Sequence, residues 1–430
     1  MDTISTFVLN ESIKTGVYYL GHASILIKIN GRTILMDPIV CSVPYSGSWV
    51  FFPPQKIDEV LYEVDAVVVS HIHQDHYDPE FLSKLNEGCK VIVIGGRPSF
   101  EENLLSRQFK RLEILEAGVS HEIFPGVRIF GMLHEANGID ASALVYSDSF
   151  SVYHGNDNYC SMDVLEEFQK VVPEVDVACL PYAYIHWYPF LLVEELQTEE
   201  RKVETENLVF QYMKHLVDSA RLLRAKIVIP FGANLVLNNG DAESVINLAV
   251  KTPLELFEVI TEQFPDVKSV VKPLIAGDTV VSNGNQLLVD QALIETAKEF
   301  RQRMSEHLSN LIDSTKKTKR KIKPASVFIE ELSHRVISKD SSLDFNIWVR
   351  LNTEGHPNFV LINPSKKLVE FRSELDSSSS YYLFILEAHC SLAWLSGESL
   401  EEIIGMRGFS LMRHPDEYRP DALKFVNTVL

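Results

Sequence analysis

Short apolar runs, separated by turn residues, dominate the first half of the chain. The Asn30-Gly31 pair between two such runs is a strong signal for a tight hairpin. Runs of this length and pattern predict buried β-strands. We expect strands at about 17–20, 25–29, 33–36, 66–70, 91–94, 127–133, 142–147, 150–154, 175–180 and 226–229.

Helical patterns alternate with these strands. They lie at about 79–85, 194–224, 252–264 and 289–313. Strands that alternate with helices indicate a layered α/β architecture. A strongly basic stretch that closes at Pro324 predicts an exposed linker over 315–324. We therefore expect a catalytic domain over 1–314 and a small α+β domain of unassigned role over 325–430.

Composition and charge exclude several classes of function. The chain has 430 residues, of which 46% are hydrophobic and 23% charged, as is usual for a globular protein. Its 40 basic and 59 acidic residues give a formal charge of −19, which argues against a nucleic-acid partner. Apolar runs are too short for a membrane helix, so no membrane association is expected. The sequence does not indicate an oligomeric state.

The cysteines and the amino-terminal residues indicate a cytoplasmic protein. The start of the chain lacks a charged segment followed by an apolar one, so no signal peptide is expected. An odd number of dispersed cysteines fits a reducing compartment. They show no C-x-x-C spacing and lie at Cys41, Cys89, Cys160, Cys179 and Cys390.

The strongest chemical signal is the run His71-Ile72-His73-Gln74-Asp75-His76, which directly follows a predicted strand. Imidazole and carboxylate together suit zinc, iron or manganese. The bland alternative is a solvated polar loop. The spacing H-x-H-x-D-H at a strand end resembles the signature of the metallo-β-lactamase superfamily.

Further residues follow the order of that superfamily. Segments 21–24 and 36–38 resemble its opening hairpin, His134 ends a predicted strand, and Asp157 follows another. The resemblance implies an αββα metallo-β-lactamase sandwich. It also implies that His71, His73 and His134 hold one metal, that Asp75 and His76 hold a second, and that Asp157 bridges the two. Without the resemblance, His134 and Asp157 would be ordinary polar residues at strand ends.

One departure from the superfamily pattern concerns the second metal. A last histidine is expected after the final αβ unit, but the matching strand runs into Pro230-Phe231-Gly232. Proline cannot ligate, so the second site is either open or completed by another side chain. The two candidates are His154 and His186, as ligands or as acid–base groups beside Asp75. The alternative for each is a pocket residue that binds no metal.

The Pro230-Phe231-Gly232 turn and the segments 211–217, 404–407 and 413–418 resemble the catalytic part of cytidine-monophosphate-N-acetylneuraminate hydroxylases. That family carries a Rieske iron–sulfur domain with paired C-x-H and C-x-x-H motifs. No cysteine of this chain starts such a motif. The resemblance implies two metal ions, with iron favoured, and electrons from a separate ferredoxin or reductase.

Three functions are consistent with these residues. The first is a diiron oxygenase or hydroxylase that acts on a small polar metabolite. The second is a zinc- or manganese-dependent hydrolase of an ester, lactone or phosphodiester, in which a metal-bound hydroxide attacks. The third is a non-catalytic protein that uses the fold as a scaffold, against which six retained ligands argue. The closer resemblance and the missing histidine favour oxidation.

Overall fold

The computed structural model of the chain describes residues 5–6, 10, 12–39, 44–56, 59–134, 140–157, 159–183, 185, 188–192, 198–238, 244–284, 286–291, 295–312, 322–338, 341, 343–353, 358–415, 419, 421–422 and 425–426. The chain divides into two compact units. The first combines 1–185 with 207–313, and the second combines 186–206 with 314–430. The domain boundaries expected from the sequence stay a prediction, and most of the basic segment 315–324 lies outside the described residues.

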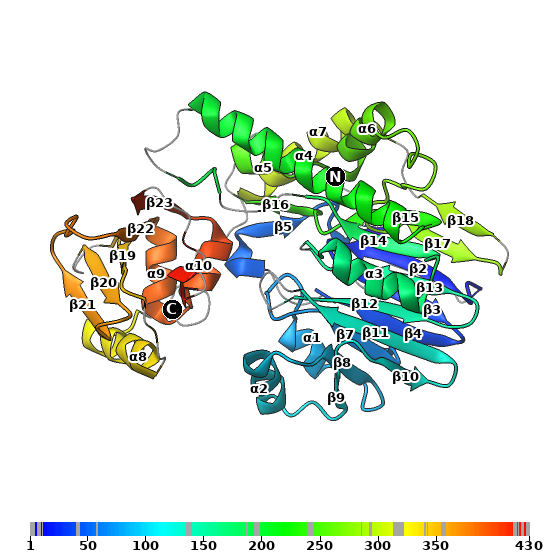
Figure 1. Ribbon diagram of the computed structural model, residues 1–430, viewed down its shortest axis with the longest axis horizontal. Coiled ribbons are helices and arrows are strands. Elements are labelled where there is room, and N and C mark those ends of the chain that lie inside the picture. Colours follow the sequence, from blue (N-terminus) through cyan, green and yellow to red (C-terminus); the bar gives the residue numbers. More distant parts are fainter. Residues whose placement is uncertain are drawn as a thin grey trace. The chain divides into compact units, whose positions relative to one another are not determined.

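Two β-sheets form the centre of the first unit (Figure 1). The eight-stranded sheet has the order β18 (Leu287–Asp290), β17 (Thr279–Ser282), β2 (Gly16–Gly21), β3 (Ser24–Ile29), β4 (Arg32–Met36), β7 (Ala66–Val69), β8 (Lys90–Ile94) and β9 (Leu112–Leu115). The six-stranded sheet has the order β10 (Ser120–Phe124), β11 (Val127–Leu133), β12 (Ala141–Tyr146), β13 (Ser151–His154), β14 (Val177–Pro181) and β15 (Ile227–Phe231).

Successive side chains of a strand point to opposite faces of a sheet, and this alternation builds two cores in the first unit. Val17 and Tyr19 of β2 lie in the core between the sheets, together with Ile129 and Val145 of the facing sheet. The intervening residues of β2 lie in a second core on the outer face. The long apolar runs are therefore strands that are buried on both faces.

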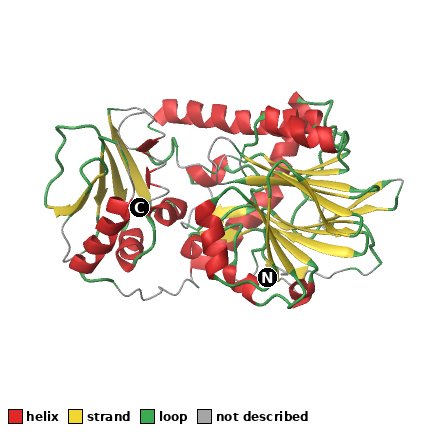
Figure 2. Cartoon of the chain, turned by 60° about the horizontal axis from the view of Figure 1, so that its bottom comes forward, coloured by secondary structure: helices red, strands yellow, loops and turns green. Residues whose placement is uncertain are grey.

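Helices cover both outer faces of this sandwich (Figure 2). Phe81 of α1 (Pro79–Ser83) and Phe100 of α2 (Pro98–Ser106) pack into the outer core of the eight-stranded sheet. On the six-stranded sheet, Phe168 of α3 (Met162–Val171) contacts the rings of Phe130 and Tyr153 edge-on. This unit also contains α5 (Val245–Ala249), α6 (Pro253–Gln263), α7 (Ala297–Ile312) and the part of α4 (Thr198–Leu222) from residue 207 onward.

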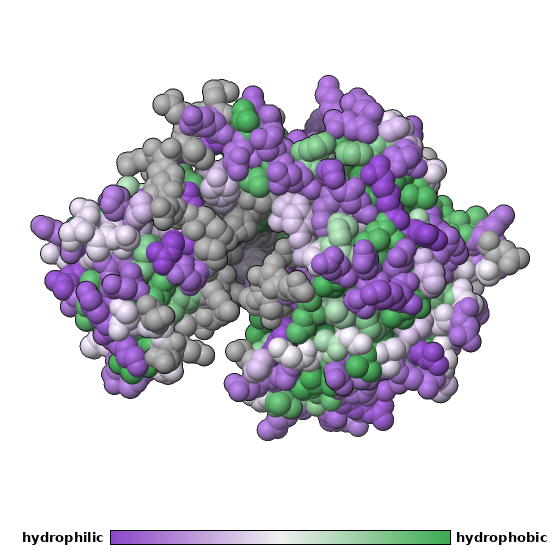
Figure 3. All heavy atoms as spheres, viewed as in Figure 1, coloured by the Kyte–Doolittle hydropathy of each residue, from purple (hydrophilic) through white to green (hydrophobic). Residues whose placement is uncertain are grey.

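The αββα sandwich predicted from the sequence is confirmed, and so is an additional C-terminal α+β unit. The second unit has a five-stranded sheet and three described helices. Its elements are β21 (Leu368–Arg372), β20 (Phe359–Asn363), β19 (Asn346–Arg350), β22 (Tyr381–Leu386), β23 (Phe409–His414), α8 (Ala325–Ser338), α9 (Ala388–Ser396) and α10 (Leu400–Met406). Hydrophilic residues lie on the visible face of both units (Figure 3).

The predicted helix over 289–313 is wrong at its start. Residues Leu287–Asp290 form strand β18, which pairs with β17 around Gly284 in a left-handed conformation, and the helix begins only at Ala297. The hairpin adds two strands to the eight-stranded sheet through the pairing of β17 with β2. Two further pairs of short strands are β16 (Leu235–Leu237) with β5 (Trp49–Phe51) and β1 (Ser5–Thr6) with β6 (Gln55–Lys56).

No described helix combines the length and the apolar content that crossing a bilayer requires.

Close approach of the two sheets depends on Gly131 of β11. A Cβ atom at this position would lie 2.2 Å from Cδ1 and 2.4 Å from Cγ1 of Ile94, on the facing sheet. We expect Gly131→Ala to lower the free energy of unfolding by about 1–3 kcal/mol, the usual cost of an overfilled core. Urea unfolding measures this change. Ile94→Val removes Cδ1, so the double variant should recover part of the loss, and strict additivity of the two changes would contradict the proposed clash.

Candidate metal centre

Loops at one edge of both sheets carry the candidate ligands. Strands β4, β7 and β8 run parallel in one sheet, and β13, β14 and β15 run parallel in the other. Because parallel strands end at the same edge, the loops after β4, β7, β13 and β15 can meet there. The β2–β3 turn joins them, since β2 and β4 are both antiparallel to β3.

The predicted metal loop directly follows β7, as expected. Tyr77 closes it by donating its backbone N–H to the carbonyl of His73 (2.9 Å). Asp78 then caps helix α1, because its side chain accepts the N–H of Phe81 and Pro79 occupies the first turn. The short loop is therefore fixed at both ends, by a buried strand and by a capped helix.

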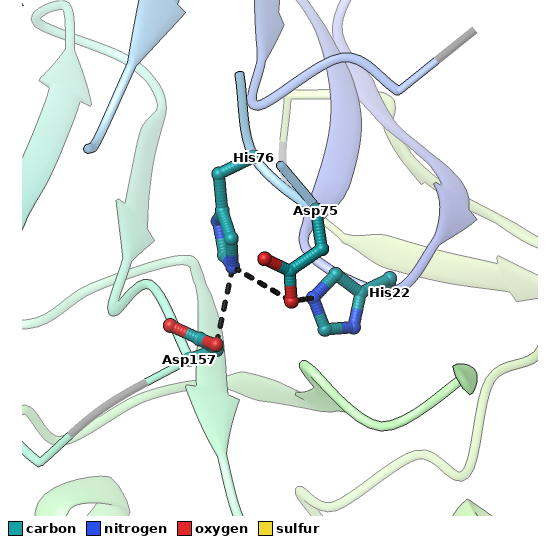
Figure 4. A group of neighbouring side chains, drawn as sticks. All are labelled: His22, Asp75, His76 and Asp157. Atoms are coloured by element: carbon teal, nitrogen blue, oxygen red, sulfur yellow. Dashed lines mark ion pairs between the residues drawn. The ribbon is translucent and has the colours of Figure 1, made fainter. Parts of the chain in front are cut away.

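Two groups of potential ligands converge at this edge. In the first group, His22, Asp75, His76 and Asp157 each offer an atom within 4.8 Å of the others (Figure 4). In the second group, His71, His73 and Asp140 likewise each offer a ligand atom within 4.8 Å of the others. Most of these side chains are buried, and Asp157 is partly exposed.

Asp157 lies between the two groups. Its Oδ2 is 3.2 Å from Nε2 of His76, and its Oδ1 is 4.0 Å from Nε2 of His71. Each carboxylate oxygen therefore faces a different group of ligands. This is the arrangement that a bridging carboxylate requires.

Asp37 and Ser70 orient two of the histidines. The Nδ1 atom of His76 donates to Oδ2 of Asp37 (2.7 Å), and the Ser70 hydroxyl donates to the same oxygen (2.6 Å). The Ser70 oxygen then accepts from Nδ1 of His71 (2.9 Å). Both rings consequently present Nε2 to the site, as outer carboxylates commonly arrange for metal-binding histidines.

The ionisable groups of the site are arranged to favour a cation. Burial alone would lower the pKa of His76, but Asp157, Asp75 and Asp37 raise it well above its usual value. Burial alone would raise the pKa of Asp75, but His76, His22 and His73 hold it well below. Burial, assisted by His76 and His73, lowers the pKa of His71. A proton on His76 thus balances the carboxylates, and a metal ion can replace it.

Unsatisfied polar atoms give an independent test of fit. Within the described part of the chain, Nδ1 of His22 makes no hydrogen bond, and Nε2 of His22 and Nε2 of His76 make none beyond their ion-pair contacts with carboxylates. Buried polar atoms without partners are rare and destabilising. A cation bound by these lone pairs and by the adjacent carboxylates would satisfy them. The residues present therefore fit a metal site.

Of the six ligands predicted from the sequence, five fall in the two groups, and His134 does not. Its Nε2 is hydrogen-bonded to the Ser142 hydroxyl (2.7 Å), whereas Nδ1 has no described hydrogen-bond partner. Asp140 lies beside the histidines, with Oδ1 3.5 Å from Nε2 of His71. Asp140 has no signal in the sequence, because it lies just before strand β12 and belongs to no motif. A role for His134 stays a prediction.

The two histidines suggested as replacements for the missing ligand are placed differently. His154 is fully buried at the end of β13, where Nε2 donates to the Ala23 carbonyl (2.8 Å) and burial lowers its pKa. It belongs to neither ligand group among the described residues. His186 lies outside the described residues. The side chain that the structure adds to the second group is instead His22, from the β2–β3 turn.

A protein-family model described as "Beta-lactamase superfamily domain" matches residues 16–231, just over half of the chain.

Two curated relatives differ in what their names state. The chain is 32% identical over 187 residues to a "Putative Rieske 2Fe-2S iron-sulfur protein" of Mycolicibacterium smegmatis, a match that covers 40% of this chain and 35% of that protein. It is 30% identical over 174 residues to a "UPF0173 metal-dependent hydrolase" of Sulfolobus acidocaldarius, covering 38% and 69%. The match thus spans about a third of the length of the first relative.

Solved structures with similar folds include both hydrolytic and oxidative proteins. Igni18, a metallo hydrolase from Ignicoccus hospitalis, has 18% identity and a TM-score of 0.41, with 63% of this chain and 98% of that chain covered. CmlA, a diiron beta-hydroxylase from Streptomyces venezuelae, has 15% identity and a TM-score of 0.44, with 65% and 54% covered.

Proposed function

Because the chain belongs to the beta-lactamase superfamily and is a metal-dependent enzyme of that fold, we propose that it is a diiron oxygenase. It hydroxylates a small polar metabolite and takes electrons from a separate donor. In this reaction one atom of dioxygen enters a C–H bond and the other leaves as water, with consumption of two electrons and two protons.

The composition of the two ligand groups carries this proposal. One group pairs His71 and His73 with Asp140, and the other pairs His22 and His76 with two carboxylates. Two histidines with one carboxylate and open positions are the ligand set of non-haem iron oxygenases, and some catalytic zinc sites share it. Three carboxylates in the two groups, one of them between the groups, support two iron ions.

The proposed roles of the residues follow from their contacts. His71, His73 and Asp140 would hold one ion, His76 and Asp75 would hold the other, and Asp157 would bridge them. The bound ions would supply the activation of dioxygen. Asp75 is further fixed by the Tyr45 hydroxyl, which donates to its Oδ1 (3.0 Å).

His154 is better suited to positioning than to proton transfer. Its Nε2–H is engaged by the Ala23 carbonyl, and its pKa is lowered by burial, so the ring is neutral and holds the β2–β3 turn in place.

The need for an external electron donor has support from the relatives. The mycobacterial relatives are named as putative Rieske 2Fe-2S iron-sulfur proteins, and only about a third of their length matches this chain. No cysteine in this chain starts a C-x-H or C-x-x-H motif. We therefore propose that a ferredoxin or reductase supplies the electrons. The narrower resemblance to cytidine-monophosphate-N-acetylneuraminate hydroxylases, including the Pro230-Phe231-Gly232 turn, is the reason to expect a small polar substrate.

The second candidate is a hydrolase. The Sulfolobus relative supports this candidate, because it is named as a metal-dependent hydrolase and the match covers 69% of its length. In that case the same ligands would hold zinc or manganese, and a metal-bound hydroxide would attack an ester, lactone or phosphodiester.

Metal analysis of the purified protein distinguishes the two candidates. We expect about two iron ions per chain after expression with balanced iron and zinc, and a Mössbauer spectrum of the ⁵⁷Fe-loaded protein typical of two coupled ions. A chemical reductant should then support oxygen uptake that zinc-loaded protein does not show. A protein that carries only zinc and hydrolyses bis-p-nitrophenyl phosphate or a lactone without oxygen would instead establish the hydrolase.

A further inference from the structure

We propose that His22 is the histidine that completes the second metal site. This inference rests on the proposed dinuclear centre and concerns the position left open by Pro230. His22 belongs to the turn between β2 and β3, and its side chain points to Asp75 and His76 (Figure 4). Its Nε2 lies 3.2 Å from Oδ2 of Asp75. Asp75, His76 and Asp157 all offer an atom within 4.8 Å of it.

The surroundings of the His22 ring are those of a ligand rather than of a core histidine. The side chain is fully buried, Nε2 meets only the carboxylate of Asp75 (3.2 Å), and Nδ1 has no hydrogen-bond partner in the described residues. A neutral imidazole in a protein core normally pairs both its donor and its acceptor. The ring of His76 lies edge-on at 5.1 Å between centroids, so two imidazoles meet at one carboxylate. A shared cation explains why they converge there.

The backbone of the turn is built to hold this ring in place. His22 has a φ of +49°, a left-handed conformation that non-glycine residues adopt rarely and mostly where the surroundings enforce it. Its carbonyl accepts the Gly232 N–H (2.9 Å) and the Tyr19 hydroxyl (3.1 Å), and the next carbonyl accepts from His154 (2.8 Å). Three hydrogen bonds therefore fix the turn.

The strand end that lacks a histidine takes part in this arrangement. Gly232 follows β15 with a φ of +76°, and a Cβ atom there would lie 3.2 Å from Cβ of Asp157. The Pro230-Phe231-Gly232 turn thus contacts both the bridging carboxylate and the backbone of His22. It contributes backbone support to the second site, while the ligand comes from the other sheet.

The test uses His22→Gly, because glycine adopts the left-handed conformation without strain and leaves a cavity of the size of the ring. Co²⁺ is the probe, followed by visible absorption during titration and by metal analysis after desalting. Wild-type protein should bind two equivalents. In the variant the second equivalent should bind at least about 100-fold more weakly, since loss of an outer partner alone costs 10–100-fold.

Added imidazole should restore binding of the second Co²⁺ equivalent in His22→Gly. The control is His121→Ala: His121 lies on β10, away from the site, and its ring is hydrogen-bonded to the Glu116 carbonyl. This variant should bind two equivalents with or without imidazole. Two equivalents of unchanged affinity in His22→Gly would overturn the assignment of His22 and leave the dinuclear centre intact. Failure of wild-type protein to bind a second equivalent would instead overturn the dinuclear centre.

Discussion

Replacement of Asp157 by alanine should remove both metal ions. Its two oxygens face different ligand groups, at 3.2 Å from Nε2 of His76 and 4.0 Å from Nε2 of His71, so one substitution weakens both sites. We expect both Co²⁺ equivalents to bind at least about 100-fold more weakly. This loss is larger than the one expected when only a hydrogen-bond partner of a ligand is removed. Turnover of the iron-loaded enzyme should be lost with them.

The Asp157→Asn variant separates ligation from folding, because it keeps the shape of the side chain and removes the charge. Asp148 lies exposed in the turn between β12 and β13, and Asp148→Ala is the matched control that should keep two ions. Circular dichroism and thermal unfolding confirm that each variant is folded before its metal content is compared. Retention of both ions with unchanged affinity in Asp157→Ala would show that the carboxylate does not bridge.

Replacement of Asp37 by asparagine should weaken metal binding although Asp37 is in neither ligand group. Asp37 is fully buried and accepts hydrogen bonds from Nδ1 of His76 (2.7 Å), from the Ser70 N–H (2.7 Å) and from the Ser70 hydroxyl (2.6 Å). An amide NH₂ facing Nδ1 favours the tautomer with the proton on Nε2, which cannot bind a metal. We expect a 10–100-fold loss of Co²⁺ affinity.

The same change should lower the stability of the metal-free protein by about 1–3 kcal/mol, because buried donors lose a charged acceptor. Ser70→Ala keeps the Asp37 carboxylate but removes one hydrogen bond to it and the acceptor of Nδ1 of His71, so its effect should fall mainly on the ion held by His71. Urea unfolding and Co²⁺ titration of both variants separate the two effects. A loss of stability with unchanged metal affinity in Asp37→Asn would mean that Asp37 supports the fold alone.

The part of the site that is local in sequence could be predicted, and the part that depends on strand pairing could not. His71, His73, Asp75 and His76 share one loop, so their spacing alone indicates ligands. Asp157 was expected only through the resemblance to the metallo-β-lactamase superfamily. His22 lies five strands before this loop along the chain, and it reaches the site because β2 and β4 run in the same direction beside β3.

The available signals explain what was missed. In the sequence, Gly21-His22-Ala23-Ser24 indicates only a hairpin, and the left-handed φ of His22 becomes visible in the structure alone. Asp140 has no periodic or motif signal of its own. In the fold, the strands buried on both faces were predicted well because their apolar runs are continuous. The hairpin β17–β18 was not predicted, because its strands are partly exposed and apolar and polar residues do not alternate regularly along them.

The candidate ligands come from both sheets, so bound ions would act as a cross-link of the sandwich. His22, Asp75 and His76 lie on loops of the eight-stranded sheet, whereas Asp140 and Asp157 lie on loops of the six-stranded sheet. A half-folded chain with only one sheet formed offers an incomplete set of ligands. Metal loading would therefore favour the packed sandwich by an amount that grows with the logarithm of free metal concentration. The supply of metal in the cell would then control the lifetime of the folded protein as well as its activity.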